Sequence, residues 1–267
     1  MLDRDGKIGI VCSQQGAVGV ARPGADPRQP WPFVPLTPKA GYVAFTHGLG
    51  WGDVTGDGRA DILTAESVWE RAASPGELCL RRERRFGPGG AQMQVLDVDG
   101  DGDADIVTSL AAHGWGFSWF EQRRDAKGER EWLEHKILGE KPAENPYGVA
   151  FSQLHAVAAA DMDGDGLTDI VTGKCRWAHG PQGDPEPNAP PVLYWLRLSR
   201  SKERGVEWVP HRIDDDSGVG RQVTIGDANG DGLPDVVVAN KKGTHVFLQD
   251  RKQVSREEWE KAQPKRS

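Results

Sequence analysis

The apolar residues of this chain occur in short runs, separated by polar segments rich in glycine and aspartate. An apolar, mostly β-branched run follows each of four such segments: Ile62-Leu63, Ile106-Val107, Ile170-Val171 and Val236–Val238. Another short run precedes each segment. Runs this short, rich in β-branched residues and bounded by turn residues, favour strands over helices. Each polar segment is therefore predicted to be a loop that joins two strands.

Four strand signals recur in each unit of the sequence. The first strand leads into the loop, the second leaves it, the third carries aromatic residues, and the fourth contains a repeated Glu-Trp-x-x-His phrase. The first strand is predicted at Gly48–Gly52, Gln92–Leu96, Ala156–Ala160 and Gln222–Gly226, and the third at Val68–Glu70, Phe117–Phe120, Leu193–Leu196 and His245–Leu248. The fourth is predicted at Glu131–Ile137 and Glu207–Ile213, with a weaker version at Trp31–Val34. This pattern predicts an all-β fold, a β-propeller of four-stranded antiparallel blades with about five recognisable blades.

The four loops share a set of oxygen-bearing side chains. Positions one, three, five and nine carry an oxygen ligand and position six is glycine, which permits a sharp turn. Calcium prefers several oxygen ligands on a flexible loop, so Ca²⁺ is predicted at several sites. The predicted ligands are Asp53, Thr55, Asp57 and Asp61; Asp97, Asp99, Asp101 and Asp105; Asp161, Asp163, Asp165 and Asp169; and Asp227, Asn229, Asp231 and Asp235.

These loops allow two other interpretations. An EF-hand requires glutamate at position twelve and a following helix, but position twelve is Thr64, Thr108, Thr172 or Val238. The sequence after each loop is strand-like, so the EF-hand is rejected. The other interpretation is an Asp/Gly-rich turn without metal. It fits the first loop best, because Thr55 replaces an acid at position three.

A fifth, degenerate copy of the loop opens the chain at Met1–Val11. Asp3, Asp5 and Gly6 stand in the expected register. Because no residues remain for the strand that should precede this loop, we expect the chain to begin inside a repeat, as an N-terminally truncated ring. The alternative is a natural N-terminus with a decayed repeat.

The loop phrases resemble those of the FG-GAP, or VCBS-repeat, family of β-propellers, to which the integrin α-subunit head also belongs. The resemblance covers nearly everything from Met1 to about Gln249 and implies the propeller fold and its calcium sites, but no particular activity. Phrases such as Thr46–Gly50, Ala112–Gly116 and Trp119–Gln122 are also similar to those of large secreted bacterial members. A looser likeness links the chain to the propeller of aldos-2-ulose dehydratase, a sugar lyase whose further domains would not fit in this chain.

Composition narrows the function and the location. The 267 residues suit one propeller domain at 1–250 and a charged C-terminal tail at 251–267. Net charge is −7, which argues against a nucleic-acid partner, and no apolar run is long enough for membrane insertion. Cys12, Cys79 and Cys175 give no disulfide framework. Loops of this kind usually need the calcium levels found outside the cytoplasm, so an extracytoplasmic location is predicted although no signal peptide is visible.

The end of the chain allows two descriptions. Val254–Lys261 could form a short helix with Ser255 as its N-cap. The alternative is a solvated tail.

Blade geometry predicts a second polar site. The first strand of each blade begins, and the second ends, on the face opposite the calcium loops, so residues at these ends should converge near the channel mouth. The candidate catalytic residues are His47, His155 and Arg221, each six residues before a loop, and Lys174, five residues after one. The candidate ligand-binding residues stand five residues after a loop or close to these positions in sequence: Glu66, His113, Arg176, His179, Asn240 and Lys241.

This mouth supports two main functional hypotheses. The first is a binding module for a carbohydrate or protein ligand, held by several hydrogen bonds. The alternative is a lyase or isomerase acting on a keto-sugar, with His47 and His155 as acid–base residues and Lys174 or Arg221 stabilising an enolate-like oxygen. A third hypothesis is a zinc site built from histidines of the mouth. The alternative to all three is a polar, water-filled channel without a specific function. His135 and His211 repeat in the fourth strand, which predicts a packing or hydrogen-bonding role rather than a chemical one.

Overall fold

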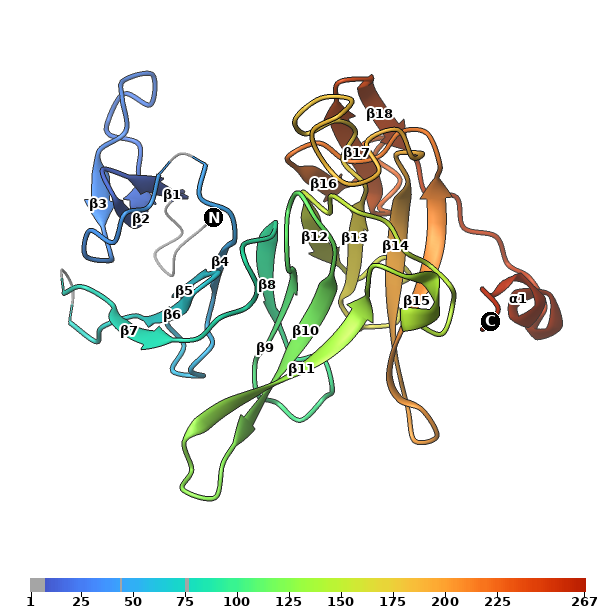
Figure 1. Ribbon diagram of the computed structural model, residues 1–267, viewed down its shortest axis with the longest axis horizontal. Helices are drawn as coiled ribbons and strands as arrows, with labels where there is room; N and C mark the ends of the chain where they lie inside the picture. Colours follow the sequence, from blue (N-terminus) through green and yellow to red (C-terminus); the bar gives the residue numbers. More distant parts are fainter. Residues whose placement is uncertain (1–7, 44, 75–76) are drawn as a thin grey trace.

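The computed structural model describes residues 8–43, 45–74 and 77–267, which fold into five successive antiparallel units (Figure 1). The first contains β1 (Ile10–Gln14), β2 (Ala17–Ala21) and β3 (Phe33–Pro35). The second contains β4 (Leu49–Gly52), β5 (Asp61–Thr64), β6 (Ser67–Glu70) and β7 (Leu80–Glu83). The third contains β8 (Gln92–Leu96), β9 (Asp105–Ser109), β10 (Phe117–Arg124) and β11 (Arg130–Leu138).

The fourth unit contains β12 (Val157–Ala160), β13 (Asp169–Gly173), β14 (Leu193–Ser201) and β15 (Gly205–Asp214). The fifth contains β16 (Val223–Gly226), β17 (Asp235–Asn240) and β18 (Gly243–Phe247). The described residues also contain two short helices, the 3₁₀ helix η1 (Pro142–Glu144) and α1 (Arg256–Ala262). In each unit, neighbours in sequence are neighbours in the sheet, which is the up-and-down order of a propeller blade. The predicted all-β, propeller-like fold is confirmed.

The blades are linked through their first strands. β4 and β8 run parallel, with Leu49 opposite Gln92 and Gly50 opposite Met93, so the second and third blades form one continuous sheet. Gly50 is required for this approach, because a Cβ atom there would lie 2.5 Å from the carbonyl oxygen of Met93. Figure 1 shows the blades following one another along an arc from β1–β3 to β16–β18. Within the described ranges, the first blade does not pair with the last.

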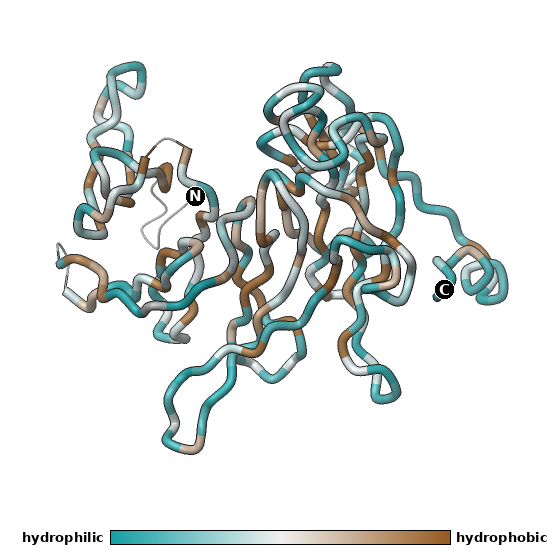
Figure 2. Tube along the Cα trace, in the orientation of Figure 1, coloured by the Kyte–Doolittle hydropathy of each residue, from teal (hydrophilic) through white to brown (hydrophobic). Residues whose placement is uncertain are grey.

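The hydrophobic cores lie between neighbouring blades. Ile62 and Trp69 of the second blade pack with Val18 of the first, and Phe120 of the third blade packs with Leu63 of the second. Corresponding clusters join the third blade to the fourth and the fourth to the fifth. Figure 2 shows the apolar positions concentrated on the strands, with polar loops at their ends. Each blade therefore buries its faces against its neighbours, as stacked repeats must.

Some strands differ from the prediction. β7 was not predicted because Leu80-Arg-Arg-Glu is mostly charged, as suits an outer strand exposed to water. The weak fourth strand expected at Trp31–Val34 is confirmed as β3: β1 and β2 are joined by a tight turn as β5 and β6 are, so β3 has the place that β7 has in the second blade. The fifth blade has three strands, and the degenerate loop at Met1–Val11 lies largely outside the described residues.

The C-terminal segment contains a short helix, which was one of the two structures that the sequence allowed. Ser255 caps α1 in a capping box with Glu258. The guanidinium of Arg197 on β14 lies 5.6 Å from the ring centre of Trp259, and the backbone N–H of Ser267 donates to the carbonyl of Pro146 at 2.8 Å. The segment 251–267 is thus attached to the fourth blade. In the part of the chain that the structure describes, no helix combines the length and apolar character needed to cross a bilayer.

Candidate functional site

Four histidines from three blades gather at the ends of strands opposite the aspartate loops. His47 precedes β4 and His155 precedes β12, while His113 lies between β9 and β10 and His179 between β13 and β14. The aspartate loops join the first and second strands of each blade at their other ends. Blade topology alone therefore brings these histidines to one face, as predicted.

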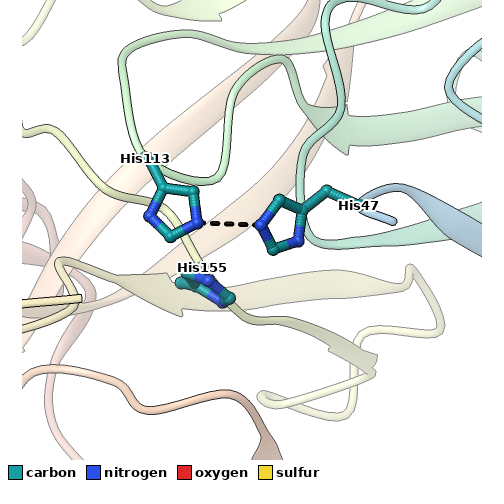
Figure 3. A group of neighbouring side chains, drawn as sticks. All are labelled: His47, His113 and His155. Carbon is teal, nitrogen blue, oxygen red and sulfur yellow. Dashed lines mark hydrogen bonds between the residues drawn. The ribbon is translucent and has the colours of Figure 1, made fainter. Parts of the chain in front are cut away.

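The central three histidines, His47, His113 and His155, are here called the histidine cluster (Figure 3). Nε2 of His47 lies 2.8 Å from Nε2 of His113. The ring centre of His155 lies 5.0 Å from that of His47 and 4.8 Å from that of His113. One ring nitrogen from each residue falls within 4.8 Å of the others. The three nitrogens therefore surround a common point.

Asp184 organises the edge of this cluster. Its Oδ1 lies 3.0 Å from Nδ1 of His179, and its Oδ2 accepts the His179 backbone N–H at 2.9 Å. The same Oδ1 lies 3.8 Å from Nδ1 of His113, whose ring is 4.3 Å from that of His179 between centres. Burial opposes ionisation of Asp184, but the hydrogen bonds and charge of His179 keep the pKa of its carboxyl below its ordinary value. Asp184 therefore presents a negative charge to two histidines.

Burial keeps the histidine cluster neutral. Loss of solvation is the main cause that lowers the pKa of His155 to about 4, and the charge of Arg221 adds to it. Burial followed by Arg221 also lowers the pKa of His47, and burial followed by the charge of His179 lowers that of His113. Neutral imidazoles have one nitrogen lone pair free to accept a proton or bind a metal.

Two nitrogens of the cluster lack a hydrogen-bond partner among the described residues. Nε2 of His155 and Nδ1 of His113 are both inaccessible to solvent and unbonded. His155 as a whole is only 6 % exposed. Buried polar atoms normally have partners, and one that has none points to a missing partner or a functional role.

The structure brings Arg221 to the cluster but occupies Lys174 elsewhere. Arg221 acts on His47 and His155 through its charge. Lys174 is 1 % exposed, and its Nζ donates to Oγ of Ser152 at 2.6 Å and lies 3.5 Å from the Pro185 carbonyl. The expectation that Lys174 faces the mouth is therefore wrong, because its ammonium group anchors the segment 174–192 between β13 and β14.

The remaining predicted ligand residues divide into two groups. Glu66 pairs with Arg81 and Arg85 of its own blade, at 4.0 and 3.7 Å. Asn240 donates to the Ser217 carbonyl, and Lys241 donates to the carbonyls of Trp177 and Ala178. These side chains support the strand ends and loops instead of pointing together at one pocket. Arg176 and His179, by contrast, lie on the segment 174–192 with one side open to solvent.

That segment also forms a cavity of about 590 Å³ that the sequence did not predict. The guanidinium of Arg176 lies 4.6 Å from the ring centre of Trp177 in its wall. Asn188, Arg212, Asp215 and Asp216 supply the rest of its polar lining. The only available signal was the length of 174–192, which is rich in proline and glycine, because long loops in compact domains are often functional.

Backbone strain collects around the same face. Trp177 has a φ of 52°, Gln153 of 59° and Glu186 of 48°. Among the described residues other than glycine, Gln15 alone joins them in positive φ. Residues held in such conformations cluster at functional sites, where the surrounding structure maintains the strain.

Two aspartate loops gather acids in a form suited to a hard cation. Carboxylate oxygens of Asp97, Asp99 and Asp101 lie within 4.8 Å of one another, as do those of Asp161, Asp163 and Asp169. Oxygen donors of this kind and number fit Ca²⁺. Asp165 lies in the second group's loop and accepts the Leu167 N–H at 2.8 Å. The donor sets of these two loops therefore match the predicted metal.

The other two loops match it less closely. Asp57 forms an ion pair with Arg59, and the hydroxyl of Thr55 lies 3.4 Å from Asp53. In the last loop, the Asn229 amide donates to Asp231 at 2.9 Å, while Asp227 accepts from Gly230 and Gly232. Fewer acids face one another in these loops.

The position-nine aspartates have a structural role that the sequence did not reveal. Asp105 accepts the N–H of Val98 at 2.9 Å with one oxygen and that of Gln122 on β10 at 2.8 Å with the other. Asp61, Asp169 and Asp235 repeat this bridge from the loop to the third strand or to the residues just after it. All four are at most 1 % exposed, and burial is the main cause that raises the pKa of Asp105 to about 6. Each aspartate thus fastens its loop to its blade.

Successive antiparallel blades of three or four strands, with an aspartate loop between the first and second strands of the second to fifth blades, define a repeat protein of the β-propeller class. The chain carries FG-GAP repeats: residues 97–172 match the family described as FG-GAP-like repeat, and residues 219–250 match FG-GAP repeat. The resemblance inferred from the loop phrases is thereby confirmed. Among curated proteins, none matches the sequence.

Proposed function

We propose that this protein is a calcium-binding, extracytoplasmic propeller module that binds a carbohydrate on the face opposite the aspartate loops. The observation that carries the proposal is the cavity at Arg176 and Trp177, built by the same segment that carries His179. An aromatic ring beside charged and amide side chains suits a sugar, since the ring covers its apolar face and the polar groups bind its hydroxyls. The strained backbone of Trp177 supports a functional assignment.

Screening against immobilised oligosaccharides, followed by calorimetry with the best-bound sugar, tests the carbohydrate proposal. Trp177→Ala should weaken binding by about tenfold, the effect of losing roughly 1.4 kcal/mol of ring contact. Trp31→Ala is the matched control, because Trp31 lines a different cavity in the first blade. The proposal fails if no sugar binds, if only a protein ligand binds, or if both variants bind the sugar equally.

Calcium is proposed to stabilise this module through the loops beginning at Asp97 and Asp161, and the need for abundant calcium supports a location outside the cytoplasm. A ligand that binds only the folded state raises its stability. The melting temperature should rise by several degrees between chelator and millimolar calcium. Superimposable melting curves would contradict the calcium assignment.

The second candidate is a lyase acting on a keto-sugar, favoured by the approach of His47 to His155. One imidazole would remove the proton beside the carbonyl, and the other would protonate the departing hydroxyl, releasing water. Arg221 would stabilise the enolate-like oxygen. Incubation with keto-sugars should then yield an ultraviolet-absorbing enone that His47→Ala does not form. Absence of product from the parent protein would eliminate this candidate.

A further inference from the structure

The histidine cluster has a composition and geometry that sugar binding does not explain. Three imidazoles from three blades converge on one point, with one nitrogen of each within 4.8 Å of the others. Nε2 of His155 is buried without a hydrogen-bond partner among the described residues. The three histidines share one hydrogen bond, so other nitrogen lone pairs are buried without a partner. Burying unpaired polar atoms costs free energy unless a further group binds them.

We propose that His47, His113 and His155 form a binding site for one divalent transition-metal ion of the zinc class, separate from the calcium loops. Neutral imidazole is a preferred ligand of Zn²⁺, and three protein ligands leave a fourth position for water or another ligand. The site does not depend on the proposed carbohydrate function. Calcium is a poor occupant, because it prefers oxygen ligands.

The distances fit a metal after small side-chain movements. Zn–N bonds of about 2.0 Å in a tetrahedral site place ligand nitrogens roughly 3.3 Å apart. His47 and His113, at 2.8 Å, need to separate slightly, and His155 needs to approach both. His47 and His113 are only partly buried, which leaves their side chains room to rotate toward this spacing.

Asp184 supplies the outer contact that such a site requires. Metal-binding histidines usually direct their second nitrogen to a carboxylate, which fixes the ring orientation. Nδ1 of His113 lies 3.8 Å from Oδ1 of Asp184, while its Nε2 faces His47. His113, His179 and Asp184 also lie close enough to hold a metal, but His179 and Asp184 already hydrogen-bond each other at 3.0 Å. The histidine cluster is the better site, because the unpartnered Nε2 of His155 belongs to it alone.

Calorimetric titration of chelator-stripped protein with Zn²⁺, in saturating Ca²⁺, tests this site. The parent should bind one equivalent tightly. His47→Ala, His113→Ala and His155→Gln should each weaken binding by more than the about 10–100-fold expected for Asp184→Asn, which removes only an outer contact. His135→Ala is the matched control and should retain binding, because His135 stacks on Trp119 of β10 and is not part of the cluster. Calcium-dependent melting of each variant checks that it is folded.

Replacing Zn²⁺ with Co²⁺ provides a second readout, since a four-coordinate nitrogen site gives visible absorption bands that the His155→Gln variant should lose. The proposal is overturned if the parent binds no zinc. It is also overturned if His155→Gln binds zinc as tightly as the parent, or if His179→Ala rather than His155→Gln abolishes binding. Carbohydrate screening in chelator and in zinc tests sugar binding separately, so failure of the zinc site can be told apart from failure of the proposed function.

Discussion

At the scale of single residues, the aspartates of the loops have two different roles, structural support and metal binding. Asp105 is buried and accepts backbone N–H groups from its loop and from β10, whereas Asp101 of the same loop is exposed and accepts the nearby N–H of Asp103. Both match the loop phrase equally well. Sequence could identify the phrase but not this division, because it depends on which carboxylate the third strand covers.

Asp105→Ala and Asp101→Ala should therefore separate structure from metal binding. In chelator, Asp105→Ala should lower the free energy of unfolding by about 2–5 kcal/mol, because two buried N–H groups lose their acceptor. Asp101→Ala should change it by less than about 0.5 kcal/mol while reducing the stabilisation that calcium provides. Urea unfolding with and without calcium measures both. Equal losses for the two variants in chelator would refute the bridge.

Histidine is also divided between two environments. The fourth-strand residues pack as predicted, with His135 stacked on Trp119 at 4.2 Å between ring centres and His211 on Trp195 at 4.6 Å. Burial, with a smaller contribution from the charge of Arg197, lowers the pKa of His211 to about 4. These histidines stabilise blades instead of forming the mouth.

This depressed pKa predicts acid sensitivity. Because His211 titrates near 6.5 when unfolded and near 4 when folded, the unfolded state binds more protons between these values, so stability falls as the pH drops through this window. His211→Phe retains an aromatic ring against Trp195 but cannot titrate. Between pH 7 and 4 in chelator, it should lose about 2 kcal/mol less stability than the parent. Parallel stability profiles for the two proteins would contradict this assignment.

At the scale of elements, the loops and the first three strands of most blades could be predicted, while the connections could not. Apolar runs and aspartate phrases located β8, β12 and β16 to within a residue. β7 was missed because an outer strand needs no apolar pattern, and the cavity within 174–192 was missed because irregular backbone leaves no period in the sequence. The repeated sequence pattern made the blade cores predictable. The segment 174–192 has no such repeat, so its cavity could not be predicted.

The four loops should differ in calcium affinity. Those beginning at Asp97 and Asp161 gather three acids each and should bind most tightly. The loop at Asp227 should be weaker because Asn229 carries no charge, and the loop at Asp53 weaker still because Asp57 pairs with Arg59. Anomalous scattering from crystals grown at graded calcium concentrations would show this order of occupancy. Filling of the Asp53 loop before the Asp97 loop would contradict it.

At the scale of the whole molecule, the two faces formed by the ends of the strands differ in their residues and in their proposed roles. Aspartate loops hold one face together, and the opposite face combines neutral histidines, a strained loop and a sugar-sized cavity. Alignment of the repeats could predict that His47, His113, His155 and His179 meet, because equivalent positions of different blades share a face. It could not predict that Lys174 is buried or that Asp184 faces two histidines, since both depend on the fold of one loop.

Binding by the double variant His47→Ala/His155→Gln tests this division most directly. Its affinity for zinc in saturating calcium, and for the sugar that the parent binds best, should be measured by calorimetry, with calcium-dependent melting recorded on the same preparation. The separate roles of the two faces predict that zinc binding is lost, while sugar affinity at the Trp177 cavity and the calcium-induced rise in melting temperature are nearly unchanged. Zinc binding by the folded double variant with the affinity of the parent would contradict the account, because the histidine cluster would then be an ordinary channel lining.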